Sequence, residues 1–197
     1  MVAVANTNAT FADLLARPDV TQAQLAAHLD ALDGEERVRQ CRALGKAQQR
    51  RLWEVCADAP AFTLEDLIPS TATGEVRWAG KNSLPLFTHF EKRFARQAGA
   101  VYGYNFNPGI AWFTGPGYFT TVQAPERAKE ILFDYTRVPS APPVADWPAV
   151  KPNSGGTAKL VYGGMHDFCR RVSQTVIIGA ATRLGKPIDA YFVLARM

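Results

Sequence analysis

His166 and Asp167 follow a glycine pair, Gly163-Gly164, and are the residues best suited to acid–base chemistry in this sequence. Histidine titrates near neutral pH, and neighbouring glycines let a substrate approach closely. In a helix, Arg170 would face His166 and its charge would favour a neutral imidazole. His166 is therefore a candidate general base, and the alternative is a surface residue of a helix.

Aromatic residues provide the second candidate site. Tyr102, Tyr104 and Phe106 alternate along the chain, so in a strand they share one face and direct two hydroxyl groups the same way. Such a face predicts either ordinary core packing or an aromatic pocket with polar handles, which is typical of small-molecule sites. The predicted ligand-binding residues are Tyr102, Tyr104, Asn105, Trp112, Tyr118, Lys81, Tyr135 and Tyr191.

Two polar residues among these would orient a ligand. Asn105 stands in an aromatic strand and needs hydrogen-bond partners if it is buried, so it either ties down a loop or contacts a ligand. Lys81 ends a predicted strand and would pair with an anionic head group or with a carboxylate such as Asp134, unless it is simply solvated.

The sequence predicts no metal site and no cofactor. The three histidines, His28, His89 and His166, lack nearby cysteines or carboxylates at ligand spacing. Haem ligation by one histidine is the alternative. The three cysteines, Cys41, Cys56 and Cys169, are odd in number and widely separated, which predicts buried thiols instead of disulfides.

Composition restricts the function classes. The 197 residues are 47% hydrophobic, which is enough for a packed core, and the formal net charge is +4. The basic residues form no long run, which argues against a nucleic-acid partner. No apolar run approaches the roughly 18 residues of a membrane span, and no secretory signal pattern is present. We expect a cytoplasmic protein.

The elements that position these residues change type near residue 75. Residues 1–9 predict a flexible tail, and residues 10–70 predict a helical region in which capping-box spacings mark three of the helix starts. The predicted helices span about 10–16, 21–32, 33–44 and 46–57.

Residues 74–197 predict an antiparallel, barrel-like domain of about eight strands. A proline-rich strap at 138–156 is expected to lie across it. Two helices are expected within this domain, at 83–95, where Phe90 and Phe94 recur at helical spacing, and at 165–172. The predicted strands are 74–79, 100–106, 110–114, 117–123, 130–136, 158–162, 174–182 and 189–196.

Five short segments carry a resemblance to a known family. They are Trp78-Ala79-Gly80-Lys81, Gly103-Tyr104-Asn105, Asp134-Tyr135, Val176-Ile177-Ile178-Gly179-Ala180 and Tyr191-Phe192-Val193-Leu194. In the order of these segments, residues 74–197 resemble the lipocalin-like (calycin-type) ligand-binding barrels of uncharacterised bacterial proteins. The resemblance implies a barrel with an internal cavity for a small lipophilic molecule, and it leaves the helical region unexplained.

These patterns together predict an α+β protein, with an amino-terminal helical region packed on a barrel-like sheet that binds a small lipophilic or aromatic molecule. One alternative is a cyclase or isomerase that acts on a lipophilic substrate in the same pocket, with His166 as base and the Tyr104 hydroxyl as electrophilic helper. The other is a protein-interaction module that docks a partner through residues 33–57. Its outward-facing arginines would be Arg39, Arg42, Arg50 and Arg51.

Overall fold

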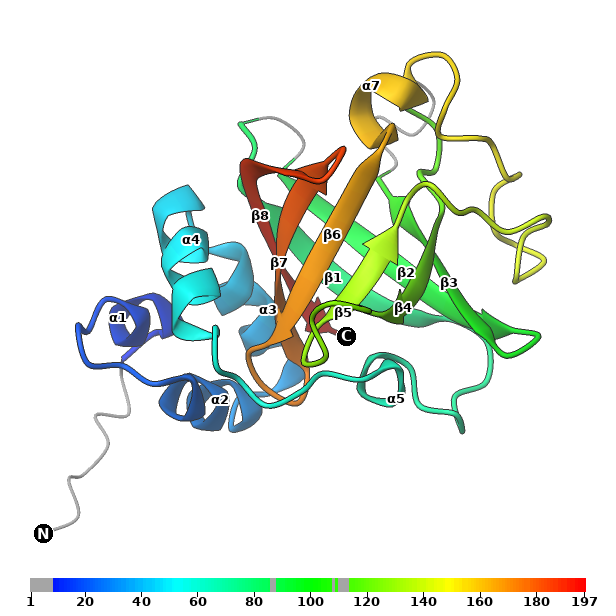
Figure 1. Cartoon of the computed structure of the whole chain (residues 1–197). Coiled ribbons are helices and arrows are strands. Elements are labelled where there is room, and N and C mark those ends of the chain that lie inside the picture. Colours follow the sequence, from blue (N-terminus) through cyan, green and yellow to red (C-terminus); the bar gives the residue numbers. More distant parts are fainter. Residues whose placement is uncertain (1–8, 86–87, 108, 110–113) are drawn as a thin grey trace, which may run out of the picture.

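The protein is an antiparallel barrel with helices packed on one side (Figure 1). The computed structural model describes residues 9–85, 88–107, 109 and 114–197. Within those residues eight strands close in chain order, with β1 pairing with β8. The predicted fold class, a helical region with a barrel-like sheet of about eight strands, is confirmed.

Each strand pairs with the next one along the chain. The strands are β1 (Val76–Asn82), β2 (His89–Gln97), β3 (Ala100–Phe106), β4 (Phe119–Gln123), β5 (Ile131–Asp134), β6 (Met165–Arg171), β7 (Val176–Arg183) and β8 (Lys186–Arg196). The helices are α1 (Phe11–Leu15), α2 (Gln22–Asp30), α3 (Gly34–Arg42), α4 (Lys46–Val55), α5 (Leu64–Leu67) and α7 (Ala158–Tyr162).

Side-chain caps begin the amino-terminal helices. Thr10 accepts a hydrogen bond from the backbone of Asp13, whose carboxylate accepts one from the backbone of Thr10. The same reciprocal pair, Thr21 with Gln24, begins α2. Each cap satisfies backbone N–H groups that have no partner inside the helix, so these short helices start at defined residues.

Helices α1 to α4 cover the outer face of β7 and β8. Phe11 and Leu25 from the helices pack with Ile178 and Val193 from the strands, and all four side chains are fully buried. Both α3 and α4 pack against β8, and α3 also contacts β1. Because each buried side chain of this size contributes about 1.5–3 kcal/mol, the helices are an integral part of the core.

At the end of the barrel where β1 begins, α5 and the segment before it close the interior. Phe62, Leu67, Ile68 and Trp78 are fully buried there, and the Trp78 indole Nε1 donates to the carbonyl oxygen of Leu67 at 3.2 Å. We call this the closed end. The opposite end lies under α7 (Figure 1) and is called the α7 end.

The predicted helix at 83–95 is wrong, because β2 spans His89–Gln97. Phe90 and Phe94 are four residues apart, a spacing that suits one face of a strand as well as one face of a helix. Both strand neighbours then decide the outcome, because β2 forms ladders with β1 and β3.

For two further segments, the predicted and observed element types are the reverse of each other. The segment predicted as a strand at 158–162 is helix α7, and the segment predicted as a helix at 165–172 is mostly strand β6. Met165 and Cys169 again have a spacing common to both element types, and pairing of β6 with β5 and β7 selects the strand. Within the predicted strand at 110–114, residues 110–113 lie outside the described residues.

Candidate functional site

Lys92 is the most informative residue of the barrel interior. Its side chain extends inward from β2, and only 2% of the residue is exposed. Its Nζ lies 4.8 Å from the ring centroid of Phe119, 5.2 Å from that of Phe133 and 5.0 Å from that of Phe192. Lysine is almost never fully buried unless it is paired, so this position calls for partners.

Three polar groups surround the Lys92 ammonium nitrogen. Asn105 Oδ1 lies 2.8 Å from Nζ, Asp167 Oδ2 lies 3.4 Å from it, and the Tyr135 hydroxyl is in direct contact. The Tyr135 hydroxyl also lies within hydrogen-bond distance of Asp167 Oδ2, at 3.2 Å. Because an ammonium group has three donors, all of them find partners here. We call Lys92, Asn105, Tyr135 and Asp167 the Lys92 cluster.

Burial shifts the proton equilibria of this cluster. Loss of water around Lys92 lowers its pKa, although the charge of Asp167 acts in the opposite direction. Burial raises the pKa of Asp167, partly offset by Lys92, and raises that of Tyr135 well above its ordinary value. Whether the proton sits on the amine or on the carboxyl group, the pair carries no net charge.

The cluster lies near the α7 end, directly below Tyr162. The rings of Tyr162 and Tyr135 stack, with centroids 5.4 Å apart and planes at 4°. A Cβ on Gly117, whose φ is +57°, would stand 2.4 Å from the Tyr162 ring, so glycine is required there. Helix α7 itself has no fully buried residue, and Leu160 is 72% exposed. Tyr162 therefore covers Tyr135 from a helix that has no buried residue of its own.

Comparisons with protein-family models, curated proteins and solved structures match nothing. No family is thereby established. The closed eight-stranded barrel is compatible with a lipocalin-like fold, and the site must be interpreted from its own geometry.

Of the residues predicted to bind a ligand, Asn105 and Tyr135 belong to the Lys92 cluster. Tyr102 and Tyr104 lie on the outer face of β3, because Val101, Gly103 and Asn105 occupy its inward positions. Because side chains alternate between the two faces of a strand, Tyr102 and Tyr104 point outward while their neighbours point into the barrel.

Tyr104 and Tyr118 support the proline-rich segment. Their ring centroids lie 5.5 Å apart, and the Tyr104 ring is 4.8 Å from that of Trp147. The Tyr118 hydroxyl donates to the carbonyl oxygen of Pro148 at 2.7 Å. Both tyrosines therefore attach residues 138–156 to the outside of the barrel.

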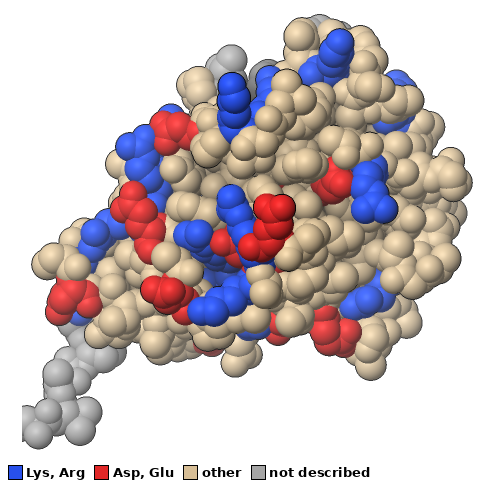
Figure 2. All heavy atoms as spheres, in the orientation of Figure 1, with Lys and Arg blue, Asp and Glu red and all other residues tan. Residues whose placement is uncertain are grey.

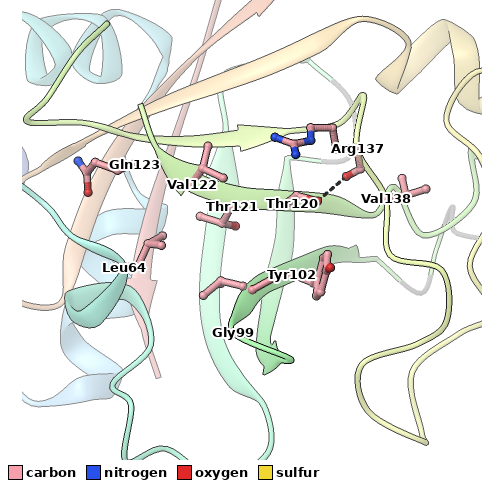
Figure 3. Close-up of a pocket in the computed structure, with 11 residues that line it drawn as sticks. Leu64, Gly99, Tyr102, Thr120, Thr121, Val122, Gln123, Arg137 and Val138 are labelled. Atoms are coloured by element: carbon pink, nitrogen blue, oxygen red, sulfur yellow. Dashed lines mark hydrogen bonds between the residues drawn. The ribbon is translucent and has the colours of Figure 1, made fainter. Parts of the chain in front are cut away.

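Tyr102 lines a surface groove of about 450 Å³ between β3 and β4. Figure 3 shows Tyr102 and Arg137 on opposite sides of Thr120, whose hydroxyl donates to the Arg137 carbonyl oxygen at 2.9 Å. This groove is separate from the Lys92 cluster, because it lies on the outside of the barrel wall.

The remaining predicted residues lie on the outer surface or outside the described part of the chain. Lys81 faces outward on β1, because its neighbour Gly80 faces the interior rings, and Tyr191 faces outward on β8 beside the inward Phe192. Trp112 lies outside the described residues.

His166 is on the outer face of β6, where its Nε2 lies 3.1 Å from Asp134 Oδ1. Asp134 also accepts hydrogen bonds from the backbone and hydroxyl of Thr136. The structure therefore does not bring His166 and Tyr104 together in one pocket. Asp167, the next residue after His166, faces inward instead and reaches Lys92.

Nothing in the described residues forms a metal centre, since no three histidine, cysteine or acidic side chains gather to hold an ion. His28 lies on α2 and bonds to Gln40, while His89 is exposed on β2, so neither faces the barrel interior. All three cysteines are buried and free, and burial raises the pKa of Cys41 and of Cys56 to about 12. Among the described helices, none has the length and apolar character to cross a membrane.

The arginines of residues 33–57 largely serve the fold. Arg50 pairs with Asp189 of β8 at 2.6 Å, Arg51 donates to the Leu15 carbonyl oxygen at 2.6 Å, and Arg39 pairs with Glu36 on its own helix. Figure 2 shows acidic and basic side chains interspersed over the face in view, with no continuous patch of one sign.

Proposed function

We propose that the barrel binds a small, electrically neutral aromatic or apolar molecule at its α7 end. The observation that carries this proposal is the buried Lys92 ammonium group, which lies among aromatic rings with Asn105, Tyr135 and Asp167 as its polar partners. Interior aromatic surface with a few convergent polar groups is the usual anatomy of a ligand site.

The charge balance of the cluster selects a neutral ligand. Lys92 and Asp167 already compensate each other, so a carboxylate ligand would meet Asp167 without a free cation. A carbonyl or hydroxyl oxygen can accept a hydrogen bond from Lys92 or Tyr135 without adding charge to a dry interior.

Tyr162 marks the position of the ligand ring. Its side chain stacks on Tyr135 above the cluster, and α7 offers little buried surface to hold it there. When α7 moves outward, an aromatic ring can take the place of the Tyr162 ring. Burying about 150 Å² of ring gains about 4 kcal/mol, whereas micromolar binding needs about 8 kcal/mol. The hydrogen bonds of the ligand's polar group must therefore contribute a large share of the binding free energy.

The experiment compares three ligands of nearly the same size: acetophenone, 1-phenylethanol and benzoate. We expect the two neutral compounds to bind in calorimetric titrations and benzoate to bind more weakly or not at all. Lys92→Met should abolish binding, whereas Glu91→Gln, which changes the adjacent outward side chain, should not. Tighter binding of benzoate, or no binding of any of the three, would refute the proposal.

The alternative of a cyclase or isomerase is not supported by the structure, because His166 and Tyr104 stand on different parts of the outer surface and do not form a pair. The interaction-module alternative through residues 33–57 is not favoured by a specific contact, since Arg50 and Arg51 are engaged within the chain. We therefore advance ligand binding alone.

A further inference from the structure

We infer that Lys92 forms an imine with a small aromatic or apolar aldehyde bound at the α7 end. This inference rests on the proposed function, because the aldehyde must first occupy the same interior position. It adds a covalent step and a substrate class, aldehydes, to the binding site.

The geometry supplies a nucleophile and a proton path. Asn105 Oδ1 holds the Lys92 nitrogen at 2.8 Å, while Asn105 Nδ2 is itself fixed by the Gly117 carbonyl oxygen at 3.1 Å. The Tyr135 hydroxyl contacts the nitrogen and lies 3.2 Å from Asp167 Oδ2, so it connects amine to carboxyl group. Imine formation needs an amine and a nearby acid that gives and takes protons.

The surroundings lower the pKa of Lys92 and so make its uncharged form easier to reach. The titratable groups that act on Lys92 are Asp167 and Cys169 from β6, and the Tyr135 hydroxyl lies against it after β5. The other neighbours are rings from β2, β4, β5 and β8. Burial lowers the pKa of Lys92 and raises that of Asp167, which makes a neutral amine beside a neutral carboxylic acid accessible.

The reaction balances without any further reagent. The Lys92 lone pair forms a C–N bond to the carbonyl carbon, and the carbonyl oxygen takes the proton of the Asp167 carboxyl group. The nitrogen then returns one proton to Asp167 through Tyr135. A second protonation from Asp167 lets the hydroxyl group leave as water while the nitrogen lone pair forms C=N. The products are water and a protonated imine paired with the Asp167 carboxylate.

The Tyr162 ring that lies over Tyr135 sets the size of the aldehyde, because the aldehyde must take its place. One aromatic ring matches the volume that the Tyr162 side chain occupies over Tyr135, and the rings around Lys92 exclude water from the C=N bond. Exclusion of water slows hydrolysis of the imine.

The test uses the full chain, benzaldehyde and sodium cyanoborohydride near neutral pH, followed by intact mass measurement and peptide mapping. We expect a single benzyl group on Lys92, at an occupancy about tenfold or more above that of any exposed lysine. Each unit by which the pKa of an amine falls raises its neutral fraction about tenfold. The map of the unaltered protein identifies the reactive lysine without relying on any variant.

Two variants and one competitor complete the design. Lys92→Met should lose the adduct, whereas Lys186→Met, which removes an exposed lysine of the β7–β8 hairpin, should keep it. Benzyl alcohol should compete with the aldehyde and slow labelling. Labels spread over exposed lysines would overturn the inference. Binding of benzyl alcohol without an adduct on Lys92 would overturn the imine and leave the proposed function intact, and no binding of either compound would overturn both.

Discussion

The two ends of the barrel are closed in different ways. At the closed end, Phe62, Leu67, Ile68 and Trp78 fill the interior with fully buried apolar groups, and the single polar atom of Trp78 has a backbone partner. At the α7 end, the ring of Tyr162 stacks on Tyr135 of the Lys92 cluster, and the helix that carries Tyr162 has no buried residue.

This difference suggests separate roles for the two ends, one in the stability of the barrel and the other in the entry of a ligand. The closed end has the composition of a domain core, where close packing supplies most of the free energy of folding. The α7 end combines a buried ion pair, which by itself contributes little to stability, with a cover carried by a helix that has no buried residue. One end therefore maintains the barrel, and the other is suited to admit a ligand.

The largest expected effect is at the closed end. Trp78→Ala should lower the free energy of unfolding by about 3–5 kcal/mol, because it leaves a large cavity beside Phe62. Tyr162→Ala should cost clearly less, since its helix is exposed. Urea denaturation of both variants measures the difference. Equal losses of unfolding free energy would show that the two ends contribute equally to stability, which would contradict the proposed difference between them.

The second-largest effect on the free energy of unfolding is expected at the Lys92–Asp167 ion pair. Lys92→Met should cost about 1–3 kcal/mol, because it leaves the buried Asp167 carboxyl group without its cation. The double variant Lys92→Met/Asp167→Asn should cost less than the sum of the two single changes, and Lys186→Met serves as an exposed control. A double-mutant cycle by chemical denaturation measures this coupling. Strict additivity would mean that the two groups do not interact in the folded protein.

The third prediction concerns pH. The folded-state pKa of Lys92 lies below the ordinary 10.5, so between these two values the unfolded chain binds more protons. The free energy of unfolding then rises with pH across that window. Lys92→Met removes this contribution, while the tyrosines and cysteines are the same in both proteins.

The stability difference between the unaltered protein and Lys92→Met should therefore grow as the pH rises through the lowered pKa of Lys92 towards the ordinary value of 10.5. Asp167, whose pKa is raised from 3.8, acts in a lower window, where stability falls as pH rises through its folded pKa. Denaturation at several pH values measures the difference, and Lys186→Met should show a constant one. A constant difference for Lys92→Met as well would mean an ordinary lysine pKa in the fold.

The smallest expected effect is on ligand affinity. Tyr162→Ala removes the ring that must leave, so acetophenone should bind about two- to tenfold more tightly, in line with the 0.5–1.5 kcal/mol of an aromatic pair. Leu160→Ala changes the same helix at an exposed position and should leave affinity unchanged. Weaker binding to Tyr162→Ala would show that Tyr162 contacts the ligand and does not merely cover the site.

Local signals in the sequence were sufficient for the helix starts and for the class of the fold. Thr10 and Thr21 cap helices at the predicted positions, since capping depends on residues three apart. Residues 83–95 and 165–172 were assigned wrongly, because side chains four apart share a face in either element, and only pairing with distant strands decides between them.

The site was harder to predict for the same reason. Asn105 is predictable because a polar amide within an aromatic strand needs partners, and Tyr135 because it belongs to the set of aromatic strand residues. Lys92 was missed, although it lies between Phe90 and Phe94, a charged residue on an apolar face once the segment is known to be a strand. Asp167 was considered with its neighbour His166, but adjacent strand residues face opposite sides of the wall.

The contacts of α3 with both β8 and β1 have a consequence for folding. All other strand pairs join neighbours along the chain, whereas β1 with β8 joins residues more than a hundred positions apart, as in the pair Trp78 and Arg196. Loop-closure entropy makes this the slowest ladder to form. Helix α3 packs across the β1–β8 ladder. Its apolar face can therefore be buried only after β8, the last strand of the chain, has paired with β1.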